Sequence, residues 1–247
     1  MINTYNESAL HETLKNIAAK QCDGKTEQKI DGADWIFDVV AKNGSVTEIQ
    51  CASLSPLEKK IRFLLSKKRN VRVIRPVIVQ KTVETLTAEG TVRSKRKSPK
   101  QESVYSILRG MGKMSDILLK IEIEVIFVEA TETRKETKNP VQLKNKSRRH
   151  LKKFVPLGKS LTKIVGKKTF CKKDDWISLL AGVEMPFTQK MLQNAILKAD
   201  FGVEGIFFND FSRKSAAKWS NYLLWLFEKM NLCKRIGKKG REIMWTM

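Results

Sequence analysis

Two acidic residues near the start of the chain have the spacing of a cation site. Asp38 closes the apolar run 35–37, and Glu48 follows it by ten residues, beyond the dipeptide Asn43-Gly44. Asn-Gly is typical of a tight β-hairpin, so the two carboxylates are expected to become neighbours on adjoining strands. Neighbouring carboxylates repel each other unless a cation lies between them, and Mg²⁺ (or Mn²⁺) prefers such oxygen ligands.

Further polar residues extend this group. Side chains alternate between the two faces of a strand, so Glu48 and Gln50 are expected on one face while Ile49 points into a core. Glu27 is preferred over Glu12 as the acidic residue that completes the site. The alternative interpretation is that Asp38 and Glu48 are surface charges of an antiparallel hairpin, which commonly faces water on one side.

The elements around these residues predict an α/β fold. Leu10, Leu14 and Ile17 recur at helical spacing, and short strands are expected at about 28–30, 35–40 and 46–52. Ser55-Pro56 then opens a second helix that runs to about residue 67. The β-branched run 71–79 has the composition of a buried strand. The resulting order is αβββαβ.

This order, with Asp38, Glu48 and Gln50 in their spacing, resembles the PD-(D/E)XK (restriction-endonuclease-like) nuclease superfamily over roughly residues 8 to 80. The resemblance implies catalytic roles for Glu27, Asp38, Glu48 and Gln50, a metal held by Asp38, Glu48 and Glu27, and hydrolysis of phosphodiester bonds in DNA. Gln50 stands where most members carry lysine, and its neutral amide supplies no positive charge. Two functional classes follow: a metal-dependent DNA endonuclease, or a catalytically inactive DNA-binding or regulatory protein on a nuclease scaffold.

A closer resemblance is to an uncharacterised bacterial family and runs along most of the chain. It includes Leu10-His11-x-x-Leu14-Lys15 and Arg96-Lys97-Ser98-Pro99-Lys100. It implies an N-terminal nuclease-like core and a C-terminal winged-helix-like domain. In such a core, His11 or Lys15 is a candidate to contact the scissile phosphate; the alternative is that both are ordinary residues of a solvated helix face.

The charge balance predicts a polyanionic partner. The chain has 48 Lys and Arg against 26 Asp and Glu, a formal charge of +22. Basic residues concentrate at 93–100 and 144–153, as expected for contacts with nucleic-acid phosphates. DNA is the expected partner, a solvated basic surface is the alternative, and an RNA-processing or RNA-binding protein is a third hypothesis.

The last third predicts a mainly α unit with a basic hairpin. Helices are expected at about 174–180, from Phe187-Thr188 to about 196, and at 215–230, and the tail that follows resembles a winged-helix domain, in which one helix enters the major groove and a hairpin contacts the backbone. A helical unit that packs on the core or on another protein is the alternative. Trp219, Trp225 and Phe227 are expected in its core. The candidate nucleic-acid contacts are Lys15, Arg96, Lys97, Lys100, Arg213, Lys214, Lys218, Lys234, Arg235, Lys238, Lys239 and Arg241.

The predicted division is 1–133 for the nuclease-like domain, 134–168 for a basic linker or exposed excursion, and 169–247 for the winged-helix-like domain. A short helix at 105–111 and a strand within 117–128 are expected to complete the first domain. The sequence shows no leader and no membrane-length apolar run, which predicts a cytoplasmic protein with no membrane partner. Its four scattered cysteines are expected to be reduced and structural. A homodimer is expected if both strands of a duplex are cut.

Overall fold

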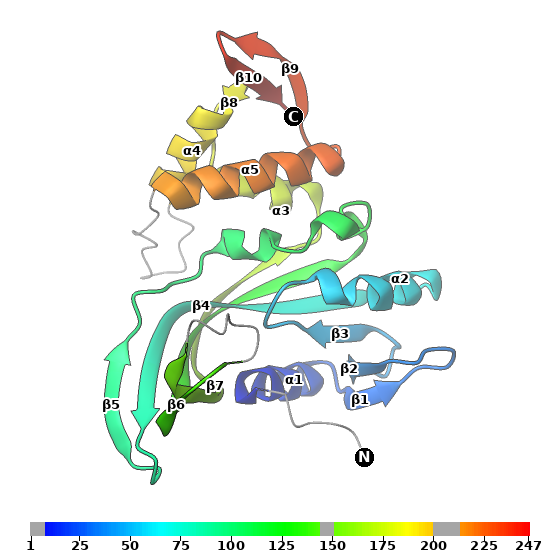
Figure 1. Cartoon of the computed structure of the whole chain (residues 1–247). Helices are drawn as coiled ribbons and strands as arrows, with labels where there is room; N and C mark the ends of the chain where they lie inside the picture. The colour runs from blue at the N-terminus through cyan, green and yellow to red at the C-terminus, as the bar shows by residue number, and fades with distance from the viewer. Residues whose placement is uncertain (1–7, 144–150, 200–212) are drawn as a thin grey trace.

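A twisted seven-stranded sheet forms the centre of the N-terminal part in this computed structural model, which describes residues 8–143, 151–199 and 213–247 (Figure 1). The sheet order is β1-β2-β3-β4-β6-β7, with β5 paired to β4. The strands are β1 (Lys25–Lys29), β2 (Ile36–Val40), β3 (Val46–Ile49), β4 (Val71–Leu86), β5 (Val92–Lys97), β6 (Glu122–Val141) and β7 (Lys152–Phe170).

Helices cover both faces of this sheet. β1, β2 and β3 are antiparallel neighbours, and β3 is parallel to β4 because α2 (Glu58–Ser66) crosses between them. α2 packs on one face, while α1 (Ala9–Gln21) packs on the opposite face through Leu10, Leu14 and Ala18. The expected succession of helix, three strands, helix and strand is observed, and the fold is mixed α/β with five α-helices in the described residues.

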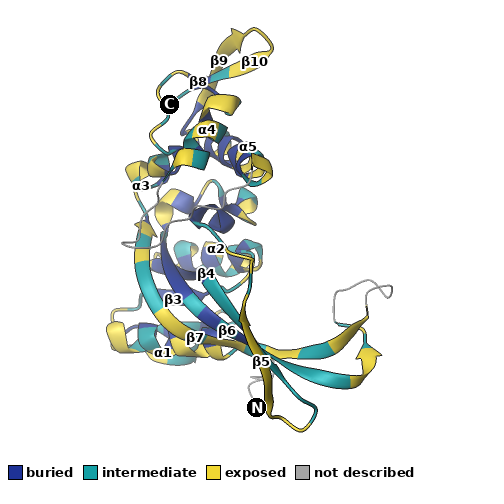
Figure 2. Cartoon of the chain, turned by 90° about the vertical axis from the view of Figure 1, so that its left-hand side faces the viewer, coloured by how far each residue is buried: buried dark blue, intermediate teal, exposed yellow. Residues whose placement is uncertain are grey.

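The strands β4, β6 and β7 are far longer than their apolar segments predict. They contain 16, 20 and 19 residues, and their distal halves are largely exposed or half-buried (Figure 2). Residues 134–141 and 152–168, expected in a linker or excursion, form parts of β6 and β7. The linker interpretation is therefore wrong for these residues: their polar side chains are accommodated because this part of the sheet faces solvent.

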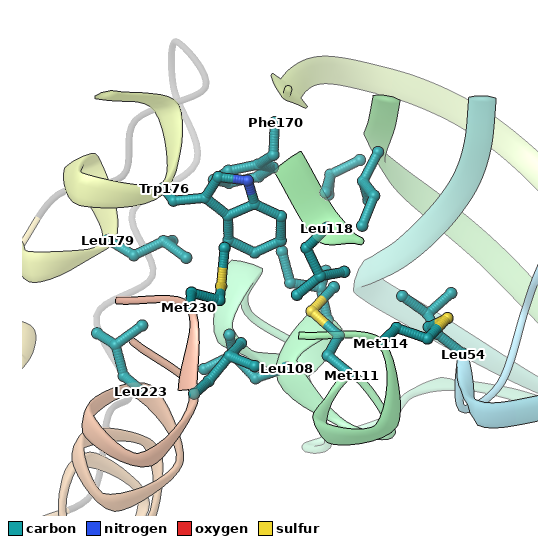
Figure 3. Packing of buried hydrophobic residues seen from close by; sticks show 14 of the residues in the cluster. Leu54, Leu108, Met111, Met114, Leu118, Phe170, Trp176, Leu179, Leu223 and Met230 are labelled. Carbon is teal, nitrogen blue, oxygen red and sulfur yellow. The ribbon is translucent and has the colours of Figure 1, made fainter. Parts of the chain in front are cut away.

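A layer of three 3₁₀ helices links the sheet to the C-terminal part. They are η2 (Val104–Leu108), η3 (Gly112–Met114) and η4 (Leu118–Lys120). The predicted helix at 105–111 is thus a shorter 3₁₀ helix, and the strand expected within 117–128 begins only at Glu122. Figure 3 shows side chains of this layer, including Leu108, Met111 and Met114, between Leu54 on the sheet side and Trp176, Leu179 and Leu223 of the C-terminal part. The two predicted domains therefore share one continuous hydrophobic core.

The C-terminal part contains the expected helices and hairpin. Its elements are α3 (Lys173–Ile177), β8 (Phe187–Thr188), α4 (Gln189–Lys198), α5 (Arg213–Lys229), β9 (Lys234–Lys239) and β10 (Glu242–Thr246), and the three strands have the order β8-β10-β9. Thr188 caps α4, since its hydroxyl oxygen accepts a hydrogen bond from the Met191 N–H at 3.3 Å. No helix in the described ranges has the length and apolar composition that a membrane span requires.

Trp225 is not a core residue. Trp219 and Phe227 are buried as expected, whereas Trp225 is 46% exposed. Its ring lies against the backbone of Gly112, where an added Cβ would come within 2.1 Å of the indole. The helical spacing placed Trp225 beside the apolar stripe of α5, but this edge of the helix overhangs the 3₁₀ layer and remains open to solvent.

Candidate active site

The strands β2 and β3 part where the two acidic residues stand. Their ladder pairs only Val39 with Thr47 and Val40 with Val46, at the end closed by the Asn43-Gly44 turn, where Gly44 has a φ of +81°. Beyond the ladder, the Ile49 N–H donates to Asp38 Oδ2 at 2.7 Å and the Asp38 N–H donates to Glu48 Oε1 at 3.3 Å. The carboxylates thus bridge the strands as substitutes for main-chain acceptors. Asp38 and Glu48 are neighbours, as the hairpin predicts.

Lys60 supplies a cation to this pair from α2. Its ammonium donates to Glu48 Oε2 at 3.0 Å and to the Ile36 carbonyl at 2.7 Å, and it lies 5.3 Å from the centre of the Phe37 ring. Lys60 was not among the residues predicted from the sequence. The spacing along the sequence could have indicated it. Lys60 lies three residues after Leu57 and four before Leu64, which are both buried, so it belongs to the face of α2 that packs on the sheet.

His11 approaches the site from α1. Its Nε2 lies 2.9 Å from the Ile49 carbonyl oxygen and 3.4 Å from Asp38 Oδ2. The Ser8 hydroxyl caps this helix by accepting a hydrogen bond from the His11 N–H, which fixes the first turn of α1 over β3. The structure therefore brings His11 to the carboxylates and does not leave it on a solvated helix face.

Glu27 takes part in a second ion pair. Its Oε1 lies 2.8 Å from the ammonium of Lys15, a residue that is only 5% exposed. Glu27 has a φ of +54°, an unusual conformation for a strand residue. Within the described ranges, no three or more His, Cys, Asp or Glu side chains are arranged to hold a metal ion. Lys15 is thus a buried partner of Glu27, and the role of Glu27 as a third carboxylate of the site stays a prediction.

The Gln50 side chain makes a local contact, whereas its main chain bonds to β4. Its N–H donates to the Ile74 carbonyl at 2.9 Å, and its side-chain Oε1 accepts from the Ala52 N–H at 3.4 Å. Among the described residues, no hydrogen bond joins the Gln50 side chain to Asp38 or Glu48. Gln50, at the position expected for the motif lysine, therefore makes no direct contact with the two carboxylates through its side chain. The cation that contacts Glu48 is Lys60 from α2.

The two carboxyl groups titrate in opposite directions. Burial, together with the negative charge of Asp38, raises the pKa of Glu48 to about 7, although Lys60 opposes the shift. Burial would also raise the pKa of Asp38, but hydrogen bonds from the His11 side chain and the Ile49 N–H outweigh it and lower that pKa below its ordinary value. Near neutral pH Asp38 is therefore ionised, whereas Glu48 is present in both its protonated and its ionised form.

Two further residues flank the end of β3, a buried arginine and a half-buried cysteine. The guanidinium of Arg75, a residue 4% exposed, donates to the carbonyls of Gln50 at 3.2 Å and Pro76 at 3.1 Å, and burial lowers its pKa. Cys51 packs against the hydrophobic cluster on the α1 side, and burial raises the pKa of its thiol to about 11. A protonated, packed thiol is a poor nucleophile, so Cys51 is structural, as predicted.

Apart from Lys15, which is buried beside Glu27, the candidate nucleic-acid contacts form two exposed groups. Arg96, Lys97 and Lys100 are exposed on and after β5. The C-terminal group is exposed as well, and Arg235 in this group also pairs with Glu228 at 2.9 Å. The members of this second group are Arg213, Lys214 and Lys218 at the start of α5, and Lys234, Arg235, Lys238, Lys239 and Arg241 on the β9–β10 hairpin.

Comparison with known proteins places most of the chain in one family. An uncharacterised protein of Treponema pallidum (strain Nichols) is 32% identical over 148 residues, which cover 56% of this chain and 57% of the relative. No solved structure matches the chain. The family described as "Domain of unknown function (DUF8091)" matches residues 8–171, from the start of α1 to the residue after β7. The chain belongs to this family.

Proposed function

We propose that this protein is a divalent-metal-dependent nuclease that hydrolyses phosphodiester bonds in DNA in the cytoplasm. The observation that carries the proposal is the convergence of Asp38, Glu48 and Lys60 where β2 and β3 separate. Two carboxylates and one ammonium at a break in a sheet combine ligands for a hard cation with a positive charge for a phosphate.

The donor set fits Mg²⁺ or Mn²⁺. The raised pKa of Glu48 reports that a second negative charge beside Asp38 is unfavourable, and a divalent cation removes this penalty. The Ile49 carbonyl adds a third oxygen, because the same His11 nitrogen contacts this carbonyl and Asp38. When bound, such an ion lowers the pKa of a coordinated water and stabilises charge on the phosphate.

The surrounding side chains have separable roles. Lys60 lies where an ammonium can hold a phosphate oxygen or the attacking water, which Gln50 does not supply from its own position. His11 orients Asp38 and the end of β3. Arg75 holds the strand end through the Gln50 carbonyl and serves the site indirectly.

The architecture supports a restriction-endonuclease-like core. The order αβββαβ, the antiparallel β1-β2-β3 ribbon and the parallel β3–β4 pair joined by α2 match the arrangement that the motif implies. The C-terminal part supports a winged-helix-like domain, because three helices precede a basic hairpin whose strand β10 also pairs with β8.

A catalytically inactive DNA-binding or regulatory protein is the second candidate. It is favoured by the ion pairs of the site, since Lys60 already neutralises Glu48, His11 contacts Asp38, and Glu27 is held by Lys15. In this case the cations would substitute permanently for a metal, and the exposed basic surfaces would be the functional part.

Cleavage assays separate the two candidates. Purified protein is incubated with supercoiled plasmid and with single-stranded DNA in Mg²⁺, in Mn²⁺ and in EDTA. The nuclease proposal expects metal-dependent cleavage that is lost in Asp38→Ala and in Glu48→Ala but retained in Asp34→Ala, a matched change at an exposed residue nearby. DNA binding without cleavage in any metal supports the regulator, and preferential binding of an RNA competitor supports the third class. Light scattering with and without duplex DNA tests the proposed homodimer.

A further inference from the structure

A basic pocket lies beside the end of β3 and is not explained by the proposed cleavage chemistry. It has a volume of about 470 Å³ and is lined by residues of β4 and β7, by the segment that follows β5, and by Arg109 after η2. Four cationic side chains contribute to its walls, namely Lys81, Lys100, Arg109 and Lys159, against the single carboxylate of Glu102. The pocket therefore carries an excess of positive charge.

Most of this charge is not neutralised by the protein. Lys81 pairs with Glu132 at 2.6 Å, and Glu102 is committed to the β4 backbone, where its Oε2 accepts from the Ile78 N–H at 3.1 Å. Lys100, Arg109 and Lys159 make no ion pair with any carboxylate in the part of the chain that the structure describes. Three cations that converge without an acidic partner favour binding of an anion from solution.

Backbone hydrogen bonds hold the segment 98–102, which forms one wall of the pocket, against β4. The Ser98 N–H donates to the Lys81 carbonyl at 2.7 Å, and the Glu102 N–H donates to the Ile78 carbonyl at 2.9 Å. These bonds clamp both ends of the segment 98–102 to β4, so the residues between them arch away from the strand and form one wall. The sequence Arg96-Lys97-Ser98-Pro99-Lys100, noted for its charge, thus has a defined conformation.

The pocket lies near the carboxylate pair. The charges of Asp38 and of the pocket residues Lys159 and Glu102 all act on the Cys51 thiol. Arg109 connects the pocket to the C-terminal part, since its guanidinium lies 5.5 Å from the centre of the Trp219 ring on α5.

We propose that this pocket binds a phosphate group of the nucleic acid processed at the Asp38–Glu48 site. The identity of the polymer rests on the proposed function, but phosphate binding does not require cleavage. Lys100, Arg109 and Lys159 approach the pocket from three separate elements and can contact several oxygens of one phosphate. A terminal phosphate monoester and an internal backbone diester share this chemistry, and they are distinguished by experiment.

The test measures binding without cleavage, by fluorescence anisotropy of labelled single-stranded DNA in EDTA. The pocket variant is the double substitution Lys100→Gln, Lys159→Gln. The control is Lys163→Gln, Lys173→Gln, which removes the same charge from exposed positions of β7 and α3 outside the pocket. We expect the pocket variant to weaken binding at least about tenfold and the control about twofold, because a charge-assisted hydrogen bond is worth more than a distant charge. Equal weakening by both variants overturns the proposal.

Two additional arms identify the phosphate and separate this proposal from the proposed function. A 5′- or 3′-phosphorylated strand that binds more tightly than the hydroxyl form, with the preference lost in the pocket variant, identifies a terminal monoester; loss of affinity without such a preference identifies a backbone diester. Calorimetry with inorganic phosphate tests the pocket if the protein binds no DNA. Phosphate binding that is lost in the pocket variant, in a protein that binds no DNA, supports the pocket and overturns the proposed function, whereas absence of both kinds of binding overturns both.

Discussion

The ammonium of Lys60 lies 3.0 Å from Oε2 of Glu48 although the two residues come from different elements, α2 and β3. Glu48 is 1% exposed, so this contact is the main electrostatic compensation for a nearly buried carboxylate that also adjoins Asp38. The position of α2 over the end of β3 therefore opposes the loss of charge from Glu48 that burial and Asp38 favour.

Replacement of Lys60 tests its role in catalysis. We expect Lys60→Gln to reduce kcat for DNA cleavage about a hundredfold or more, because one preorganised positive group is typically worth that factor in the transition state. Lys59→Gln, at the exposed neighbouring position, should leave the rate unchanged. Adding Gln50→Lys to Lys60→Gln should recover part of the rate if an ammonium at the motif position reaches the same phosphate. Equal rates for Lys60→Gln and the parent would contradict the role.

Cleavage should depend on pH through Glu48. A proton competes with the divalent cation for this carboxylate, and its pKa is about 7, so kcat/KM should rise as the pH increases through about 7. Higher Mg²⁺ concentrations should shift the midpoint to lower pH, because the metal then displaces the proton more effectively. The measurement is a pH–rate profile at two metal concentrations, and a midpoint that ignores the metal would argue against Glu48 as a ligand.

Stability should depend on pH through the same group. The pKa of Glu48 is raised from 4.5 in an unfolded chain to about 7 in the fold, so its contribution to stability is complete below about pH 4.5 and is lost as the pH rises through about 7. Glu48→Gln lacks this loss. We expect its free energy of unfolding, relative to the parent, to increase across this window by an amount on the order of 2 kcal/mol. Urea unfolding at a series of pH values measures the difference, which a pH-independent offset would refute.

The shared core predicts a single unfolding transition. Leu223 is fully buried at the contact between α5 and the 3₁₀ layer, so Leu223→Ala should lower the stability of the whole chain by about 2 to 5 kcal/mol. Leu119→Ala, at a leucine that is 42% exposed, is the matched control and should cost far less. For each variant taken alone, calorimetry and tryptophan fluorescence should report the same unfolding midpoint. Two separate transitions would show that the N- and C-terminal parts fold independently.

The β9–β10 hairpin should contribute to DNA affinity through phosphate contacts. We expect Lys238→Gln, Lys239→Gln to lower the slope of log affinity against log salt by about 0.9 for each lysine that contacts a phosphate of duplex DNA. Lys20→Gln, Lys59→Gln removes two exposed charges from α1 and α2 and should leave the slope nearly unchanged. Titrations of a labelled duplex at several salt concentrations provide the slopes. Identical slopes in the two double variants would exclude the hairpin from the interface.

Local sequence signals predict much of this fold. The Asn43-Gly44 turn, Pro56 in the 3₁₀ helix Ser55–Leu57 that precedes α2, and the Thr188 cap of α4 each determine a local conformation, and the elements beside them occur where expected. The lengths of β6 and β7 were not predictable in the same way. Their outer halves are rich in Lys, Thr and Glu, which resembles a linker in a one-dimensional pattern, and only the pairing between these strands gives them structure.

The candidate site shows the same limit. Hairpin geometry predicts that Asp38 and Glu48 meet, because their separation along the chain is short. Lys60 comes from the following helix, so its approach depends on how α2 packs against the sheet. The ion pair of Glu27 with Lys15 was likewise not predictable, because Lys15 comes from α1 and no local pattern indicates that a buried lysine would contact Glu27.

The 3₁₀ layer between the sheet and α5 has a geometric consequence. Because its apolar side chains join both parts into one core, the basic hairpin and the carboxylate pair belong to one packed body. A duplex bound by the hairpin would then present the same phosphodiester to Asp38 and Glu48 each time. The fold itself would set the number of base pairs between the bound segment and the cleaved bond.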